Sequence, residues 1–200
     1  FKIKNSFFIP NPYDDSFELL DNSKENKKKD LFFAMSHGVH RGKLKKGKYD
    51  EREKILNILE KNLKDCEFDF FGYKNVEPLW SEEFLNSIQN YNMGLNLSRG
   101  KPLKHYSSDR IVQIIGNGLL CFLHQDTKLF EIIPRNCAIY YKNNNDLYNK
   151  VMFYKNNVSE MKKIASNGKK FYRKYLNSNI VSQYLIDKVF KLKNKYNYIW

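Results

Sequence analysis

The sequence has little of what marks secreted, membrane-spanning or disulfide-bonded proteins. It contains three cysteines with no close pair, so a disulfide framework is not indicated and we expect reduced core residues at Cys66, Cys121 and Cys137. No apolar run approaches the roughly 20 residues of a membrane-spanning helix, and residues 1–4 do not form a signal peptide. These absences favour a cytoplasmic protein. Because the first residue is Phe rather than Met, we expect the chain to be part of a longer protein.

Signatures of common catalytic, metal and nucleotide sites are absent too. The sequence has no G-x-G-x-x-G or Walker loop, and no Asp-x-Asp follows a predicted strand, where it could hold a divalent cation beside a nucleotide diphosphate. The four histidines belong to no nucleophile, base and acid pattern. His37 and His40 are three residues apart but lack a third ligand at suitable spacing. We therefore expect no metal and no cofactor, and the catalytic residues stay unknown.

Acidic residues are scarce relative to basic ones. There are 22 Asp and Glu against 35 Lys and Arg, a net charge of +13, which favours anionic partners such as nucleic acid, phosphorylated ligands or an anionic membrane. The lysines are spread along the whole chain, however, whereas a nucleic-acid face needs them clustered. A diffuse solvated surface is the favoured interpretation.

Apolar runs alternate with amphipathic stretches through the middle of the chain. Two hundred residues suit one domain with a substantial core. The predicted strands cover residues 30–36, 67–72, 93–98, 119–123 and 138–141. The predicted helices cover residues 50–64, 81–88, 107–118, 127–133, 146–156 and 159–193, the last interrupted near Gly168 and residues 177–179. This alternation predicts an α/β fold with a doubly wound parallel sheet.

Two basic loops that contain glycine follow the first and third predicted strands, at residues 37–48 and 99–106. In a doubly wound sheet such loops converge at the carboxyl edge if the strand order reverses there, and a diphosphate fits between them. Glycine lets the backbone approach the phosphates, and the basic side chains supply charge. The alternative is that residues 37–48 form only an exposed basic surface loop.

The second loop runs into the helix around which the chain is organised. Ser107, Ser108 and Asp109 offer N-caps and Gly118 supplies a left-handed stop, so the helix N-terminus presents backbone donors and a favourable dipole. Arg110 can bind phosphate through its planar fork while Asp109 orients it or caps the helix. An ordinary cap with an exposed salt bridge is the alternative.

Several motifs, in order and spacing, resemble a known family. They are residues 93–100 (MGLNLSRG), 106–110 (YSSDR), 116–118 (GNG), 146–147 (DL) and 164–169 (IASNGK). Between about residues 30 and 175 the chain is similar to the C-terminal domain of group 1 type glycosyltransferases, in particular the spore-maturation-protein-like branch. The resemblance implies the Rossmann-like, donor-binding half of a GT-B enzyme, with the acceptor half preceding Phe1.

The resemblance also implies a division of the chain. Residues 1–29 would be a leading linker segment, and residues 30–175 a Rossmann-like nucleotide-sugar-binding domain. Residues 176–200 would form a C-terminal helix that packs on, or bridges to, the preceding domain.

Carried over position by position, the resemblance assigns donor contacts. Gly38 and Arg41 would lie near the donor diphosphate, the loop and helix start from Lys104 to Arg110 would embrace diphosphate and sugar, and Gln113 would lie near the ribose. The implied donor-binding residues are Gly38, Arg41, Ser98, Arg99, Lys104, Tyr106, Ser107, Ser108, Asp109, Arg110 and Gln113.

Two glutamates eight positions apart in better-known retaining members are replaced here by His105 and Gln113, so retention and inversion both stay open. In GT-B enzymes cations and helix dipoles, rather than a metal, stabilise the leaving diphosphate. Arg41, Lys104 and Arg110 would therefore act electrostatically, and any general base would come from the preceding half.

The resulting hypothesis is a hexosyltransferase-type glycosyltransferase that needs its preceding half for activity. It would transfer sugar from a nucleotide-sugar to a glycan, lipid or protein acceptor in cell-surface polysaccharide biosynthesis, with peripheral contact at the inner membrane face as an option and no nucleic acid partner. The alternative is a non-enzymatic basic α/β module that binds nucleic acid or an anionic membrane. The apolar stripe at residues 180–190, with lysines nearby, could rest on a membrane, but packing against the body is favoured.

Overall fold

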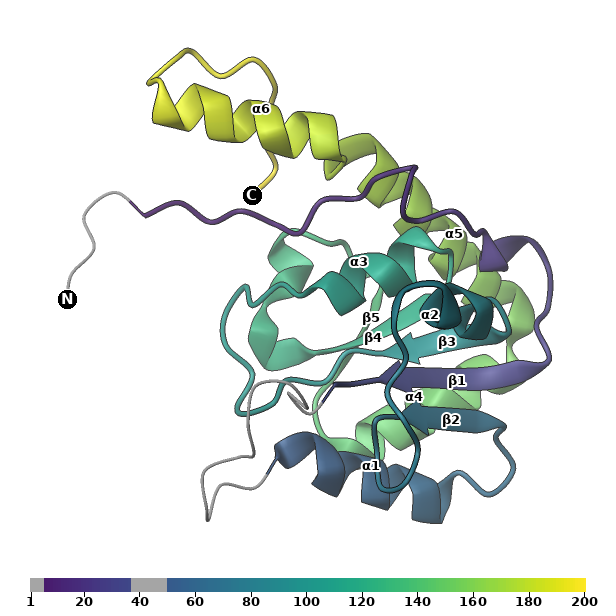
Figure 1. The fold of residues 1–200 in the computed structure, drawn as a ribbon. Helices are drawn as coiled ribbons and strands as arrows, with labels where there is room; N and C mark the ends of the chain where they lie inside the picture. The colour runs from purple at the N-terminus through teal and green to yellow at the C-terminus, as the bar shows by residue number, and fades with distance from the viewer. Residues whose placement is uncertain (1–5, 37–49) are drawn as a thin grey trace.

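The computed structural model describes residues 6–36 and 50–200 and has a parallel sheet at its centre (Figure 1). The sheet has five strands in the order β2-β1-β3-β4-β5, and every neighbouring pair is parallel. The strands are β1 (Lys29–Ala34), β2 (Phe68–Phe71), β3 (Tyr91–Leu95), β4 (Leu120–His124) and β5 (Ile139–Tyr141). The predicted doubly wound α/β fold is confirmed.

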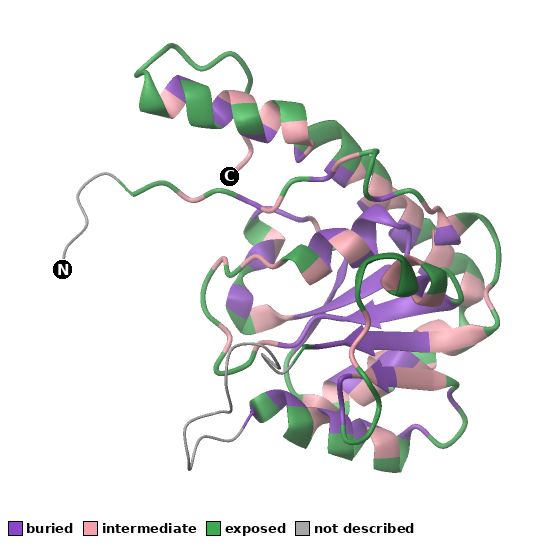
Figure 2. Ribbon diagram, viewed as in Figure 1, coloured by how far each residue is buried: buried purple, intermediate pink, exposed green. Residues whose placement is uncertain are grey.

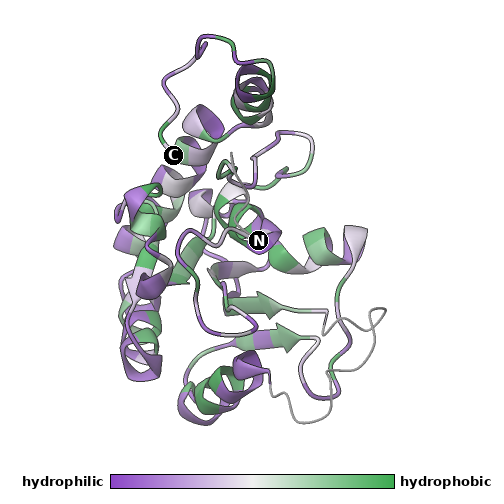
Figure 3. Ribbon diagram, turned by 90° about the vertical axis from the view of Figure 1, so that its left-hand side faces the viewer, coloured by the Kyte–Doolittle hydropathy of each residue, from purple (hydrophilic) through white to green (hydrophobic). Residues whose placement is uncertain are grey.

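Helices cover both faces of the sheet. They are α1 (Glu51–Asn62), α2 (Ser81–Ile88), α3 (Asp109–Gly116), α4 (Asn144–Asn156), α5 (Val158–Tyr175) and α6 (Ser178–Val189). Side chains of α1 and α4 share one core cluster with one face of the sheet, and side chains of α2 and α3 share the other. Because both faces are covered, β3 is buried along its whole length (Figure 2), and the strands are mainly hydrophobic (Figure 3).

Several predicted boundaries differ from the observed ones. Residues 127–133 form no α-helix; short 3-10 turns at Gln125–Thr127 and Leu129–Glu131 stand there instead. Gly168 does not interrupt α5, which runs through it unbroken. A Cβ at Gly168 would lie 2.5 Å from the Cys137 carbonyl oxygen, so the glycine serves close packing of α5 on the chain before β5.

The cysteines are buried and form no disulfide, as predicted. Burial raises the pKa of Cys66 to about 12 and that of Cys137 to about 11, and it raises the pKa of Cys121 as well. These thiols are therefore protonated core groups. In the part of the chain that the structure describes, no helix combines the length and apolar character needed to span a bilayer.

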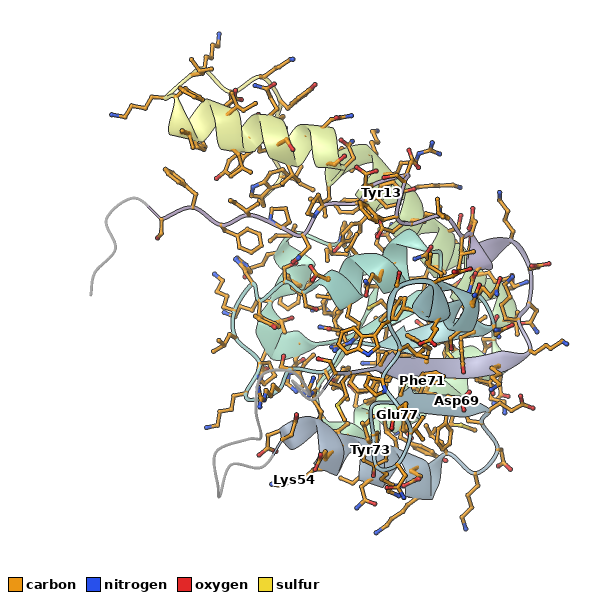
Figure 4. All side chains as sticks on the ribbon, in the orientation of Figure 1. Tyr13, Lys54, Asp69, Phe71, Tyr73 and Glu77 are labelled. Carbon is orange, nitrogen blue, oxygen red and sulfur yellow. The ribbon has the colours of Figure 1, made fainter. Side chains whose placement is uncertain are left out.

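The N-terminal segment, residues 6–28, is tied to the last two helices. Tyr13 is almost fully buried; its backbone N–H donates to the Leu176 carbonyl at 2.9 Å and its carbonyl accepts from the Ser178 N–H at 2.8 Å. The Lys169 ammonium on α5 donates to the carbonyls of Leu20 and Gly116. The segment therefore runs across α3 and is held by hydrogen bonds at the junction of α5 and α6, where Tyr13 lies (Figure 4).

Candidate functional site

A pocket of about 1070 Å³ opens at the carboxyl ends of β1 and β3. The strand order reverses between these two strands, and crevices at such switch points are where open α/β sheets bind ligands. The pocket is lined from the N-terminal segment, the end of β1, the first turn of α1, the start of α2, the loop after β3, and α3.

Arg110, in the first turn of α3, joins the ends of the two strands. Its Nε donates to the Ala34 carbonyl at 2.9 Å, and its Nη1 donates to Asn96 Oδ1 at 3.2 Å and the Leu97 carbonyl at 3.3 Å. The guanidinium also lies 4.8 Å from the centroid of the Phe33 ring. All three oxygen acceptors are neutral, and no carboxylate of the described residues forms an ion pair with Arg110.

Burial lowers the pKa of Arg110 to about 10, and the like charge of Arg52 contributes to the shift. The guanidinium is still protonated at pH 7. Its Nη2 has no hydrogen-bond partner among residues 6–36 and 50–200, although Arg110 lines the pocket. The site therefore presents a held cation with one donor group available.

Asn96, just after β3, organises the start of α3. Its buried Oδ1 accepts from Ser108 Oγ at 2.9 Å as well as from Arg110 Nη1. Ser108 is the N-cap residue of α3, but its hydroxyl makes no capping bond because it is turned to Asn96. The Ile111 N–H donates to the Ser108 carbonyl at 2.9 Å, so the amides of Asp109 and Arg110 are the first-turn donors left for a ligand at the positive end of the helix dipole.

A buried ion pair flanks the pocket at the start of α1. Asp50 caps α1 by accepting from the Arg52 N–H at 3.0 Å, and the same carboxylate accepts from Arg52 Nε at 2.9 and 3.1 Å. Arg52 lines the pocket together with Arg99, whose side chain is exposed. The pair with Asp50 offsets the charge of Arg52. The remaining charged lining is mixed, with Arg99 and Arg110 beside Glu18, Glu82 and Asp109.

The structure brings six of the predicted donor-binding residues to the pocket: Arg99, Tyr106, Ser108, Asp109, Arg110 and Gln113. Lys104 and Ser107 are not among the lining residues: Lys104 Nζ lies 3.4 Å from Glu131 Oε2, and Ser107 Oγ accepts from the Asn11 N–H at 3.3 Å. Ser98 does not line the pocket either. Gly38 and Arg41 lie outside the described residues, so their assignment stays a prediction.

Neither predicted role of Asp109 is observed. Asp109 is the first residue of α3 rather than its cap, and it forms no salt bridge with Arg110 in the described part of the chain. Its Oδ1 instead accepts from Asn11 Nδ2 at 2.5 Å, which ties the N-terminal segment to the mouth of the pocket. The N-cap of α2 is Trp80, whose side chain makes no capping bond.

Sequence reasoning missed the contributions of Asn96, Arg52 and Glu18. Asn96 carried a usable signal, because it is a lone amide within the apolar run of residues 93–97. Arg52 resembled any charged residue of an amphipathic helix. Glu18 lines the pocket from the N-terminal segment, and burial raises the pKa of its carboxyl; nothing local in the sequence indicates that position. No group of three His, Cys, Asp or Glu within the described ranges could hold a metal ion.

Comparison with solved structures shows the same fold within larger proteins. A sucrose-phosphate synthase from Thermosynechococcus elongatus matches with a TM-score of 0.53 and 14% identity, over 91% of this chain and 49% of that one. The Anabaena protein HepE, solved in complex with UDP, matches with a TM-score of 0.52 and 11% identity, over 81% of this chain and 40% of that one. This chain thus spans half or less of the length of each.

Comparison by sequence places the chain in a family. No curated protein matches it. The model of the family described as glycosyl transferase-like matches residues 51–187, a range that includes α1 to the end of β5, Arg110 with its acceptors Asn96 and Leu97, and most of α6. The chain belongs to this glycosyl transferase-like family.

Proposed function

We propose that this chain is the donor-binding half of a GT-B glycosyltransferase and binds a nucleoside diphosphate sugar in the pocket at the ends of β1 and β3. The observation that carries the proposal is Arg110, a cation held by neutral acceptors at the switch point, with Nη2 left for an anion. The family match and the UDP complex of HepE support this ligand class.

In this proposal the diphosphate lies between Arg110 and the first turn of α3. The guanidinium and the free amides donate to phosphate oxygens, and they stabilise the charge that develops when the bond from sugar to phosphate breaks. The Gln113 side chain makes no hydrogen bond to a described residue and lies one turn further along α3, where it binds a ribose hydroxyl. Arg99 adds charge at the rim. The fixed cations take the place of a metal ion.

The acceptor side belongs to the rest of the enzyme. A GT-B site lies between two domains, so this half binds the donor but does not turn it over alone. We place the chain in the spore-maturation-protein-like branch, acting on a glycan, lipid or protein in cell-surface polysaccharide synthesis. The residue motifs at 93–100 and 106–110 support that branch.

Calorimetric titration with UDP, GDP, ADP and pyrophosphate, with and without EDTA, tests the proposal. We expect saturable binding that prefers one nucleotide and is insensitive to EDTA. Arg110→Ala weakens it about 10- to 100-fold, because charge-assisted hydrogen bonds are each worth about 1.5–3 kcal/mol.

The matched control is Arg135→Ala. Arg135 lies over the Phe130 ring at 4.5 Å, as Arg110 lies over Phe33, but away from the pocket. We expect the Arg135→Ala variant to leave nucleotide binding unchanged. Equal, salt-sensitive binding of every polyanion, reduced alike in both variants, would contradict the proposal and favour a basic module that binds polyanions. Thermal melts of each variant show whether lost binding reflects lost folding.

A further inference from the structure

The end of α6 and the segment after it expose several apolar side chains to solvent. Val189 and Phe190 are each 69% exposed. The exposed apolar residues here, which we call the α6 patch, are Leu185, Ile186, Val189, Phe190 and Leu192. Because they are neighbours along the chain, they form a patch rather than scattered apolar positions, and exposed patches mark interaction surfaces.

The α6 patch is not the side by which α6 packs on the rest of the chain. Val181, Tyr184 and Asp187 are the buried residues of the helix, and the Trp200 ring lies 5.2 Å from that of Tyr184. With about 3.6 residues per turn, the patch residues within α6 lie on the other side. The helix extends away from the sheet (Figure 1), and much of its surface is exposed (Figure 2). Packing against the body, the interpretation favoured for this stripe, thus uses one side of it.

Lysines alternate with the apolar residues of the α6 patch. They are Lys188, Lys191, Lys193 and Lys195. The last three are exposed and form no salt bridge with a carboxylate of residues 6–36 and 50–200. The nearby Asp187 carboxylate instead accepts from Gln183 Nε2 and the Lys195 N–H at 2.8 Å each, and from the Tyr198 hydroxyl. The α6 patch therefore joins apolar surface to positive charge that has no anionic partner.

This combination favours an anionic lipid bilayer over other partners. Apolar side chains are stabilised at the acyl boundary of a bilayer, while lysines lay their stems along apolar surface and reach the lipid phosphates with their ammonium groups. A nucleic acid pairs with lysines through its phosphates, but it leaves the apolar side chains in water. A second copy of this chain would bring like charges together, which is unfavourable.

We propose that the α6 patch docks the protein on an anionic membrane surface. Val189 and Phe190 enter the boundary between headgroups and acyl chains, and the lysines bind lipid phosphates. Binding then has an apolar part, which depends on the patch, and an electrostatic part, which depends on anionic lipid. Docking needs neither the pocket nor a nucleotide, so it can be tested separately from the proposed function.

Vesicle flotation measures the docking directly. The chain is mixed with vesicles of phosphatidylcholine and phosphatidylglycerol, or of phosphatidylcholine alone, at low and high salt. We expect saturable binding to the anionic vesicles and much weaker binding to the neutral ones, because each lysine near an anionic surface contributes about fivefold in affinity. High salt weakens the binding, since it screens this contribution.

The apolar part is tested at Phe190. Phe190→Ser weakens binding to anionic vesicles about 5- to 30-fold, because its ring no longer leaves water on docking. The matched control is Phe153→Ser, which removes an exposed aromatic side chain of α4. We expect the control to bind like the unaltered chain.

The electrostatic part is tested with paired substitutions. Lys191→Gln combined with Lys193→Gln weakens binding roughly 5- to 30-fold. The matched control combines Lys170→Gln with Lys174→Gln and removes two exposed lysines of α5. It has little effect if the α6 patch is the docking site. Equal losses in both pairs would overturn the inference, because the net charge of +13 alone would then explain the binding.

Three further outcomes would also overturn it. The first is an absence of binding to anionic vesicles. The second is a dimer in sedimentation velocity without lipid that Phe190→Ser dissociates, which would assign the α6 patch to a second copy. The third is loss of vesicle binding when the preceding half is attached, which would place that half over the patch. Thermal melts show whether each variant folds, and should Phe190→Ser not fold, the lysine pairs and the two lipid compositions still decide.

Discussion

The two ends of β3 carry the same residue type in opposite situations. Asn92, near the amino end, is saturated: Oδ1 accepts from the Lys27 N–H at 2.9 Å, and Nδ2 donates to the carbonyls of Lys27 and Lys29 at 3.1 Å each. Asn96, beyond the carboxyl end, is equally buried, but its Oδ1 holds Ser108 and Arg110 at the edge of a pocket. One amide completes the backbone, and the other positions groups that face a ligand.

The charges at the two ends differ in the same way. At the amino end, Lys29 Nζ lies 2.5 Å from Asp69 Oδ2, and the Tyr91 hydroxyl donates to the same carboxylate; Figure 4 labels Asp69 on β2. At the carboxyl end, Arg110 has neutral acceptors only, and burial lowers its pKa. At the amino end, the charges of Lys29 and Asp69 therefore balance each other. At the carboxyl end, Arg110 keeps a charge that no carboxylate of the described residues pairs with, and an anionic ligand would complete this arrangement.

Replacing each asparagine with leucine tests the difference between the two ends and has the largest expected effect. Asn96→Leu removes the shared acceptor of Ser108 and Arg110, so we expect at least a tenfold loss of nucleotide affinity together with about 1–3 kcal/mol of stability. Asn92→Leu costs a similar amount of stability but leaves affinity unchanged. Denaturant melts and calorimetry on both variants measure the two quantities, and a drop in affinity for Asn92→Leu would contradict the assignment of the two ends.

The Asp69→Asn variant removes the charge of a carboxylate at the amino end of the sheet, away from the pocket. Burial by itself would raise the pKa of Asp69, but hydrogen bonds from Lys29 and Tyr91 lower it below its usual 3.8. Its ionised form therefore stabilises the fold above about pH 3.8, and that contribution is lost as the pH falls through the lowered value. Because the carboxylate is partly exposed, we expect Asp69→Asn to cost at most about 1 kcal/mol at pH 7 and to leave nucleotide affinity unchanged. Melting temperatures between pH 2 and pH 7 test both the size and the sign.

Glu18→Gln gives the smallest expected effect and the opposite sign. Burial raises the pKa of Glu18 above its usual 4.5, against a hydrogen bond from the Asp14 N–H and the charge of Lys169 on α5; the nearby Asp14 carboxylate adds to the rise. The folded state thus prefers the protonated carboxyl, so stability falls as the pH rises from 4.5 through the raised pKa. We expect the variant to lose this fall and to melt slightly higher at pH 7. An unchanged pH profile would show that Glu18 is solvated after all.

The fold could be predicted from the sequence because its signals are local. Alternation of apolar strands and amphipathic helices is set by neighbouring residues, and all five strands were placed within a few residues of their observed bounds. Gly118 follows α3 and has a φ of +78°, the left-handed conformation that was predicted for this glycine. The failures were local signals overridden by packing. Gly168 was predicted to interrupt a helix, but it is there for contact with Cys137.

The site could be predicted only in part, for a physical reason. Ser108 and Arg110 were found because a helix N-terminus after a basic loop has a sequence pattern. Three other features come from segments that meet only in three dimensions: the partner residue Asn96, the Phe33 ring beneath Arg110, and Trp80 in the pocket lining. The same limit applies to Asp109, whose partner Asn11 lies far away in the chain.

The backbone hydrogen bonds of Tyr13 to Leu176 and Ser178 indicate an order in which parts of the chain fold. A ribosome makes Tyr13 well before it makes Leu176 and Ser178, the backbone partners of Tyr13. Contacts between such distant positions form late, because closing a long loop is entropically unfavourable until the rest of the chain is compact. Phe17 follows Tyr13 by four residues and lines the pocket, so it reaches its final position only after α5 has been made. A nascent chain stalled before the end of α5 would hold a finished sheet and an unfinished pocket.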